Sequence, residues 1–249
     1  MPKYAAYGAT LGMGTRQVET ANVVGTITGS GNATFTVTAP GMGGTPKAVL
    51  VAVLLNDVAD TVAEKARAAL ILDADVIAWF EVSGSGAQVV LTRRIAAANE
   101  ATMNIAYTNT TCTGLTPDAT SDDTRAGIAS ANIAYIKSIG GPSLSLDTED
   151  VTTHDSTEAW EEVVATVLRT GEVSMDLVYD PNAATHSTVA GGLLDYYETG
   201  ELAYFDCEFV DTYHWRFAGY VTKFEPTAPV EGALTASVSL KITGKPIIV

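Results

Sequence analysis

The sequence is poor in the residues that build most metal, disulfide and cofactor sites. Its 249 residues include only two cysteines, Cys112 and Cys207, and three histidines. Disulfide frameworks and zinc sites need clustered ligands, and these residues are scattered along the chain. The sequence therefore predicts no metal site, no cofactor and two unlinked thiols.

Positive charge is also scarce. The chain has 14 Lys and Arg against 29 Asp and Glu, which gives a formal net charge of -15. A protein that binds nucleic acid directly needs a basic surface to neutralise phosphates, so direct binding is excluded as a primary role. Only 17% of residues are charged while 47% are hydrophobic. That balance argues against disorder and predicts a globular or assembly-forming chain.

Long apolar runs are missing. The longest, Ala48 to Leu55, is far shorter than the roughly 20 residues that a membrane-spanning helix needs. The N-terminal residues MPKYAAYGAT lack the apolar core of a signal peptide. We therefore expect no membrane segment.

What the first half contains in abundance is Gly and Thr, in short alternating stretches separated by turn residues. A change to helical spacing predicts one helix over Asp57–Leu72, with Asp57 or Asp60 as its N-cap. The sequence thus predicts a compact α+β module, followed by a polar linker over Thr110–Ala131. The expected strands are 18–28, 32–39, 47–55, Val76–Val82, Ala87–Arg93 and Thr102–Thr108.

The second half has longer, aromatic-containing stretches with a period of two. One helix is expected over Thr185–Thr199, after the turn that Pro181 marks. The expected strands are Asn132–Leu146, Glu172–Asp180, Leu202–Val210, His214–Phe224 and Leu234–Thr243.

Most of the acidity belongs to this second half. Residues 15–130 carry 7 basic and 11 acidic residues, whereas the rest of the chain carries 7 and 18. Strand alternation places Glu172 and Asp176 on the face opposite the apolar residues of their strand. Asp206 and Glu208 repeat this arrangement on another strand. Two strands are therefore expected to be apolar on one face and acidic on the other.

No enzyme motif stands out. The segment around His154 and Asp155 combines a histidine, carboxylates and hydroxyls, but adjacent residues on a loop point in different directions. The glycine-rich pieces at 12–14 and 41–44 lack the Lys-Ser/Thr that a phosphate loop requires. The sequence predicts a protein that is not an enzyme.

An ordered string of short motifs carries a family resemblance. GPSLS stands at 141–145, DVTTHDS at 150–156, GEVS at 171–174 and ITGKP at 242–246. In this order, together with Tyr4–Gly14, they resemble the major tail tube proteins of long, non-contractile-tailed bacteriophages. The match covers roughly residues 131–246.

The resemblance implies a mainly β fold: a tail-tube β-sandwich with one flanking helix, here interrupted by a small α+β inserted domain. The tail tube domain would comprise 1–14 and 131–249, with 15–130 inserted and the linker at about 110–131. In the family, the first strand returns through a short loop, whereas here some 115 residues intervene before Ile133 resumes the pattern. We expect this inserted domain on the outside of the tube.

The resemblance also implies self-assembly into hexameric rings that stack into the tube through which the genome passes. Further partners would be the tape-measure, tail terminator and tail tip proteins, and DNA would pass without specific binding. The protein would reside in the virion tail, and in the host cytoplasm during assembly.

Two sets of residues are candidates for this role. The acidic residues Glu172, Asp176, Asp206 and Glu208 are expected to face the lumen, because a conduit should repel phosphate. The long segment from Asp147 to Arg169 mixes polar and large apolar residues, a mixture suited to burial on assembly. It is expected to be a loop that joins successive rings. Its candidate residues are Asp150, His154, Asp155, Trp160, Val164 and Leu168.

A carbohydrate-binding or adhesive β-rich surface module remains the alternative. It would use aromatic residues such as Trp79, Trp160 and Trp215 to line a sugar-binding groove.

Overall fold

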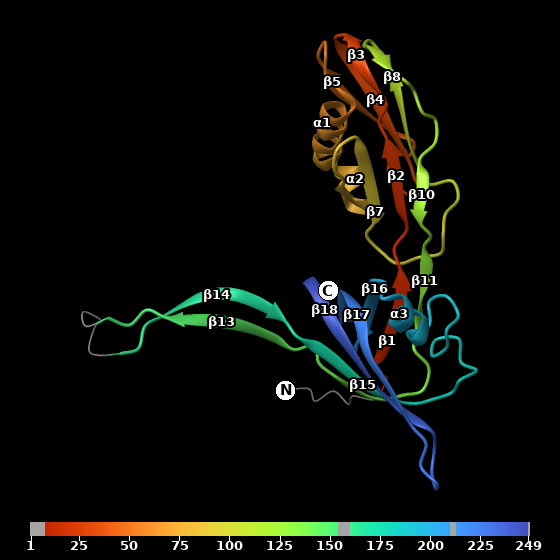
Figure 1. Cartoon of the computed structure of the whole chain (residues 1–249), viewed down its shortest axis with the longest axis vertical. Helices are drawn as coiled ribbons and strands as arrows, with labels where there is room; N and C mark the ends of the chain where they lie inside the picture. The colour runs from red at the N-terminus through yellow and green to blue at the C-terminus, as the bar shows by residue number, and fades with distance from the viewer. Residues whose placement is uncertain (1–7, 154–159, 210–212, 249) are drawn as a thin grey trace. The chain divides into compact units, whose positions relative to one another are not determined.

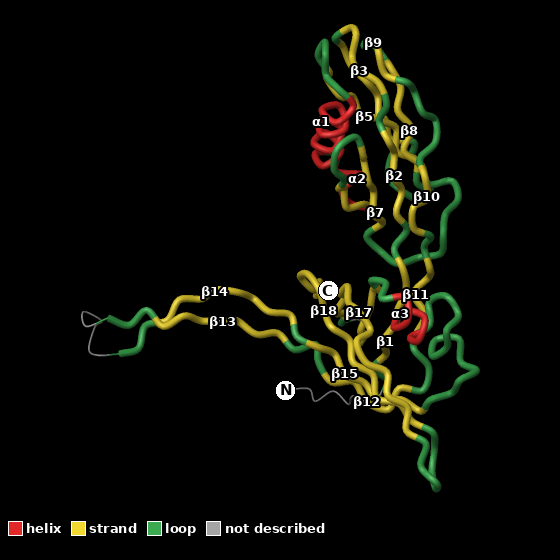
Figure 2. The backbone as a smooth tube through the Cα atoms, in the orientation of Figure 1, coloured by secondary structure: helices red, strands yellow, loops and turns green. Residues whose placement is uncertain are grey.

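The structure of the chain is a computed structural model that describes residues 8–153, 160–209 and 213–248 (Figure 1). It divides into two compact units. The continuous unit comprises Gly14–Ala129, and the split unit comprises residues 1–13 and 130–249. Both are built mainly from strands (Figure 2), so the prediction of a mainly β fold is confirmed.

The split unit is organised around one curled seven-stranded sheet, in the order β11-β1-β16-β17-β18-β15-β12. Every pair along the run β16-β17-β18-β15-β12 is antiparallel. The strands are β1 (Thr10–Thr15), β11 (Ile128–Asn132), β12 (Ile136–Gly140), β15 (Glu172–Val178), β16 (Ala203–Glu208), β17 (His214–Thr227) and β18 (Thr235–Ile248).

One face of this sheet carries the core of the split unit. Alternate residues along β15, β16 and β18 are buried, as strands with one solvated face require. Helix α3 (Leu193–Thr199), the one helix in the described residues of this unit, packs on this apolar face through Leu193 and Tyr196. It ends at Gly200, whose φ of 65° is in the left-handed region that favours glycine at a helix C-terminus. The flanking helix is therefore present on one face, and the other face stays open.

A two-stranded ribbon extends from the same unit. β13 (Leu144–Asp150) pairs antiparallel with β14 (Val163–Thr170), and β14 leads into β15 through Gly171. We call β13 and β14 the arm. It is drawn in Figure 2 as a long strand pair, and its base is held by a hydrogen bond from Thr170 Oγ1 to the carbonyl of Ile242 (3.3 Å).

The continuous unit combines three small sheets with two helices. The sheets have the strand orders β10-β2-β7-β6, β5-β4-β8 and β3-β9. Its elements are β2 (Val18–Asn22), β3 (Gly25–Gly29), β4 (Gly31–Thr38), β5 (Lys47–Val53), α1 (Ala59–Leu72), α2 (Ala74–Trp79), β6 (Phe80–Ser83), β7 (Gln88–Arg93), β8 (Asn104–Asn109), β9 (Thr113–Leu115) and β10 (Asp122–Arg125).

Helix α1 packs over the inner faces of these sheets. Its buried residues Val62, Ala66 and Leu70 join the same core as Phe35 of β4 and Val51 of β5. The unit is therefore an α+β module with its own core, as the sequence predicts for this half.

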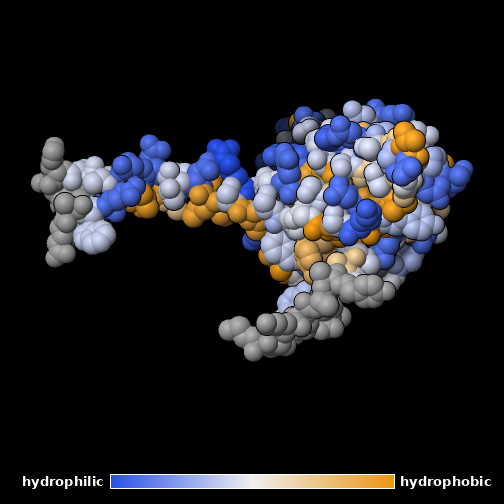
Figure 3. All heavy atoms as spheres, turned by 90° about the horizontal axis from the view of Figure 1, so that it is seen from below, coloured by the Kyte–Doolittle hydropathy of each residue, from blue (hydrophilic) through white to orange (hydrophobic). Residues whose placement is uncertain are grey.

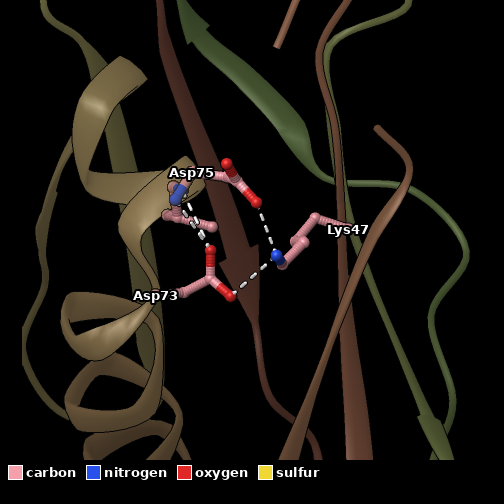
Figure 4. A network of polar contacts seen from close by, with 4 residues as sticks. Lys47, Asp73 and Asp75 are labelled. Carbon is pink, nitrogen blue, oxygen red and sulfur yellow. Dashed lines mark hydrogen bonds and ion pairs between the residues drawn. The ribbon is translucent and has the colours of Figure 1, made fainter. Parts of the chain in front are cut away.

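The junction of α1 and α2 is fixed by a cluster of charged groups (Figure 4). The Asp73 carboxylate accepts hydrogen bonds from the backbone N–H groups of Asp75 (3.1 Å) and Val76 (3.2 Å) and so caps α2. Lys47 Nζ of β5 lies 3.3 Å from Asp73 and 2.6 Å from Asp75. These carboxylates raise the pKa of Lys47 through its hydrogen bonds to Asp75 and then Asp73. The elbow between the helices is thereby tied to the sheet.

Two expectations for this unit are wrong. The strand predicted over Val76–Val82 is mostly helix α2, and only Phe80–Ser83 is strand, because the Asp73 cap starts a helix. Neither Asp57 nor Asp60 caps α1: the N-cap is Val58, without a side-chain hydrogen bond. The Asp57 carboxylate instead accepts from the Leu54 N–H (2.7 Å), which is the main reason its pKa is lowered.

The expected linker at Thr110–Ala131 is also wrong. This segment contains β9, β10 and the first part of β11, which pair with strands far away in sequence. β9 pairs with β3, and β10 pairs with β2. Small polar residues therefore do not mark a linker in this segment, because here they form edge strands.

In the split unit, the strand expected over Asn132–Leu146 is wrong because it is broken into β11, β12 and β13. Tyr135 has a φ of 56° and Gly141 a φ of 96°, so the chain turns at both places. The strand predicted at Glu172–Asp180 corresponds to β15, and those at Leu202–Val210, His214–Phe224 and Leu234–Thr243 correspond to β16, β17 and β18.

The helix expected at Thr185–Thr199 begins only at Leu193, because the residues before it form turns around His186. The His186 side chain is fully buried between the rings of Tyr135 and Tyr179. Its Nδ1 accepts from the Asp180 N–H (3.2 Å), and its Nε2 lies 2.8 Å from the carbonyl of Ala134. Both contacts are satisfied by the neutral tautomer with a proton on Nε2.

We predict that His186→Phe destabilises the full chain by about 3 kcal/mol, because it leaves a buried donor and a buried acceptor unpaired. Urea unfolding followed by tryptophan fluorescence measures this. Val189→Ala, on an exposed side chain of the same segment, is the control and should change stability by less than about 0.5 kcal/mol. Equal stability of the two variants would contradict the hydrogen-bonding role of His186.

We predict that Asp73→Ala destabilises the continuous unit by about 1 kcal/mol, the usual cost of losing an N-cap side chain. Asp73→Asn keeps an oxygen for the cap and loses only part of the attraction to Lys47, so it should cost less. Thermal unfolding of both variants separates these contributions. Equal losses for Asn and Ala would show that the ion pair, which both variants remove, and not the cap, dominates at this position.

Candidate functional site

The open face of the seven-stranded sheet brings together the four acidic residues singled out in the sequence. Glu172 and Asp176 alternate with buried Val173, Met175 and Leu177 along β15. Asp206 and Glu208 alternate with buried residues along β16. β17 and β18 lie between β15 and β16. Their register places the polar positions of β15 and β16 on the same side of the sheet. We call this side the open face.

On β15, hydroxyl groups hold one of these carboxylates. Asp176 accepts hydrogen bonds from Ser237 Oγ of β18 (2.7 Å) and Ser138 Oγ of β12 (3.1 Å). These two bonds lower the pKa of Asp176, the Ser237 bond most, so the carboxylate is ionised at neutral pH. Glu172 lies opposite Lys241 of β18, with 3.7 Å between Oε1 and Nζ.

On β16, two side chains of β17 hold the other carboxylate. Asp206 Oδ2 accepts from Arg216 Nε (3.0 Å), and Asp206 Oδ1 lies 2.8 Å from His214 Nδ1. Both partners come from β17, whose Arg216 is the direct cross-strand neighbour of Asp206. Glu208 lies opposite His214 in the same register.

The open face is therefore of mixed charge, and the purely acidic strand faces expected from the sequence are an incomplete description. Lys223 also pairs with Glu225 on β17. The alternation within a single strand does not reveal these cations, because Arg216 and Lys241 reach the carboxylates only through strand pairing. A shallow, open depression of about 310 Å³ lies on this face, lined by Lys137, Ser138, Asp176, Thr235, Ala236 and Ser237.

The arm contains both ends of the segment, Asp147–Arg169, that is expected to join successive rings. The expectation of a loop is wrong for both ends of this segment, because residues 144–150 and 163–170 form a strand pair with one bulge; the described residues between them, 151–153 and 160–162, are not strand. Leu146 lies directly opposite Leu168, and Leu144 opposite Thr170. On the other side of the ribbon, Ser145 lies opposite Arg169, which pairs with Asp147. At its base, the ribbon is apolar on one side and polar on the other.

The apolar side chains of the arm are exposed. Leu168 is 81% exposed and Leu146 is 49% exposed, with Val164 at 51% and Trp160 at 73%. Figure 3 shows hydrophobic residues gathered along one side of the arm and hydrophilic ones along the other. Asp150 ends β13, and hydrogen bonds from the Thr152 side chain and backbone lower its pKa. His154 and Asp155 lie outside the described residues.

Other chemistry has little support on the described part of the chain. Both cysteines are buried, and desolvation raises the pKa of Cys207 to about 11, so its thiol stays protonated at neutral pH. No group of three or more potential metal ligands occurs among residues 8–153, 160–209 and 213–248. No helix in those ranges is long and apolar enough to cross a membrane.

The tryptophans of the adhesive alternative have different surroundings. Trp79 is half-buried, and Cζ of the Arg93 guanidinium lies over its ring, 5.4 Å from the ring centroid. Trp215 packs edge-on against Phe209, whereas Trp160 is exposed. Within the split unit, Trp215 is therefore used in packing, and only Trp160 offers a free ring.

The sequence model of the family described as "Lambda phage tail tube protein, TTP" matches residues 118–249. No curated protein sequence matches the chain significantly.

Three solved structures are similar to part of the chain. A chain in the tail of an empty gene transfer agent particle has 17% identity and a TM-score of 0.42, covering 48% of this chain and 86% of that one. A chain in the virion of the native gene transfer agent has 15% identity and a TM-score of 0.41, and the match covers 48% of this chain and 88% of that one. A chain in the baseplate of the anti-feeding prophage has 10% identity and a TM-score of 0.37, and the match covers 48% of this chain and 83% of that one.

The family match covers more than half of the chain, including β12–β18, the arm and the open face. It also confirms the resemblance that the ordered motifs of the second half indicate. The chain belongs to the lambda phage tail tube protein family, and its role is structural, as a tail tube component of the virion.

Proposed function

We propose that copies of this chain form hexameric rings that stack into a tube, and that the genome passes through its lumen. Membership of the tail tube family supports self-association. The edge strands β11 and β12 support it physically, because within the described part of the chain each pairs with a strand on one side only. Unpaired strand edges favour association with further strands, and a ring of identical subunits satisfies every such edge.

The exposed apolar side of the arm is the observation that carries this proposal. An isolated two-stranded ribbon is marginally stable in water, and here its leucines and valines are solvent-exposed. Burying such side chains against a neighbouring copy is favourable by roughly 25 cal/mol per Å². The arm is therefore proposed to contact the adjacent ring. Its proposed contact residues are Leu168 on the apolar side, Val164 opposite Glu149 beyond the bulge, and Trp160, which lies just before β14.

The open face is proposed to line the lumen. Its carboxylates Glu172, Asp176, Asp206 and Glu208 are interspersed with Arg216, Lys223 and Lys241. A uniformly basic lining would bind phosphates and stall DNA, whereas this face has a slight excess of carboxylates. Within about 8 Å, the Debye length at physiological salt, that excess acts on a passing duplex and limits adhesion.

The continuous unit is proposed to be an insertion that lies outside the tube. A domain of about 100 residues has a radius of gyration of about 13 Å, so six copies cannot share a bore with duplex DNA. Tape-measure, tail terminator and tail tip proteins are the further partners proposed, with assembly in the host cytoplasm. A structural tube role needs no catalysis, and no activity is proposed.

We predict that Leu168→Asp abolishes tube formation, because a charge on the apolar side of the arm would be buried without a partner on assembly. Ser145→Asp, on the opposite side of the arm, is the matched control and should assemble normally. Negative-stain microscopy and sedimentation measure assembly, and circular dichroism checks that both variants are folded. Normal tubes from Leu168→Asp would show that the arm does not join subunits.

We predict that Glu172→Lys combined with Glu208→Lys leaves tubes intact but lowers genome delivery at least tenfold, because added cations bind passing phosphates. The matched variant carries Gln at both positions and should deliver nearly normally. Delivery is measured as transduced cells per assembled particle. If the Lys variant delivered as well as the Gln variant, the open face would not line the lumen.

A further inference from the structure

The continuous unit has an apolar surface at the elbow between its two helices. Ile71 is 50%, Leu72 84% and Ile77 38% exposed. Three exposed alanines surround them, since helix positions three and four apart share a face. We call this surface the elbow patch, and its residues are Ala68, Ile71, Leu72, Ala74, Ile77 and Ala78.

The elbow patch contains no charged residue, and two of its acidic neighbours in the sequence are engaged elsewhere. Asp73 and Asp75 lie in the same stretch of sequence, but both carboxylates point toward Lys47 of β5 (Figure 4). The carboxylates are thus held against the sheet, and the aliphatic side chains are left outermost.

A second uncharged surface lies on the outer face of the sheet β5-β4-β8. Strand pairing forms two rows across it: Leu50, Thr34 and Thr108, and next to them Ala48, Thr36 and Ala106. Leu50 is 61% exposed. We call this surface the threonine face, and its residues are Thr34, Thr36, Ala48, Leu50, Ala106 and Thr108.

The two surfaces face in opposite directions within the unit. Phe35 and Val37, which alternate with the threonines of β4, point into the core that also receives Val62 and Leu70 of α1. The threonine face therefore points away from α1, and the elbow patch points away from the core on the helix side. One unit thus offers two different uncharged surfaces on opposite sides.

We propose that the elbow patch of one subunit contacts the threonine face of the next subunit in the same ring. This inference rests on the proposed ring assembly. Contacts between two different surfaces repeat around a rotation axis and close into a ring. Neighbouring acidic copies repel each other, so they approach most easily where neither surface carries charge.

The occupant is a second copy of this chain and not a free partner, because the contact is too small to be stable alone. A standard stable interface has roughly 20–30 residues on each side, many more than either surface offers. Tethering the units to a ring raises their effective concentration to about the millimolar range. The contact should therefore form in assembled tubes and be absent between free chains.

Paired cysteines test this inference. A variant with Leu72→Cys and Ala48→Cys should cross-link between subunits with a short bismaleimide, giving a ladder of oligomers from assembled tubes and only monomer from unassembled protein. The native Cys112 and Cys207 are buried and contribute little background. The control pair is Ser85→Cys, in the exposed turn between β6 and β7, with Ala48→Cys.

The outcomes separate this inference from the proposed function. Normal tubes in which the test pair cross-links no more than the control pair would overturn the contact and leave tube assembly standing. Cross-linking of Leu72→Cys alone would indicate contact between two elbow patches, and would also overturn it. If the unmodified protein formed no tubes, the proposed function and this inference would fail together.

Leu72→Glu gives an independent readout. Burying a carboxylate against the threonine face should lower the temperature at which tubes dissociate, while the unfolding of the unassembled chain stays unchanged because Leu72 is exposed there. Light scattering on heating measures dissociation. An unchanged dissociation temperature would contradict the contact.

Discussion

The split unit depends on the register of its antiparallel ladder β16-β17-β18-β15. Because strand side chains alternate, the register that buries Val173, Met175 and Leu177 also turns Glu172 and Asp176 to the open face. A slip of one residue would exchange the two sets and expose the core. The core against α3, the open face and the arm, which continues directly into β15, all follow from this one pairing.

Unlike β15, the arm does not bury its apolar side chains. Its strands pair with each other while its leucine and valine side chains stay exposed to water. Folding of one copy gains little from these residues, so their free energy of burial is available for contact with another copy. The bulge between Leu146 and Thr148 strengthens the local twist and re-aims the side chains beyond it. The arm is thus a feature whose stability is completed by assembly.

Sequence reasoning was strongest where structure is local and periodic. The alternation along β15 and β16 follows from period two alone, and the burial patterns agree with it. It failed where residues far apart in the sequence determine the local structure. Helix α2 contains Val, Ile and Trp, which favour strands, whereas Lys47, far away in sequence, stabilises the Asp73 and Asp75 carboxylates at the start of the helix.

The same limitation affected the candidate site. Strand alternation identifies which residues share a face of one strand, but not which strand lies next to it. The partners of Asp206 and Glu172 are Arg216 and Lys241, and they became apparent only from the pairing of β17 with β16 and of β18 with β15. The burial of His186, which shortens the expected helix, likewise depends on Ala134 and Asp180.

Pairing of charges within the chain also bears on how acidic subunits pack together. If every carboxylate of a chain with net charge -15 stood unpaired, bringing copies together would cost electrostatic free energy at each contact. Here Asp206 is neutralised by Arg216, Asp73 and Asp75 share Lys47, and Arg169 holds Asp147 on the polar side of the arm. Internal ion pairs thus remove charge beside the apolar surfaces, and they let copies meet where burial is favourable. The remaining excess of carboxylates limits association elsewhere, and so favours ordered assembly over aggregation.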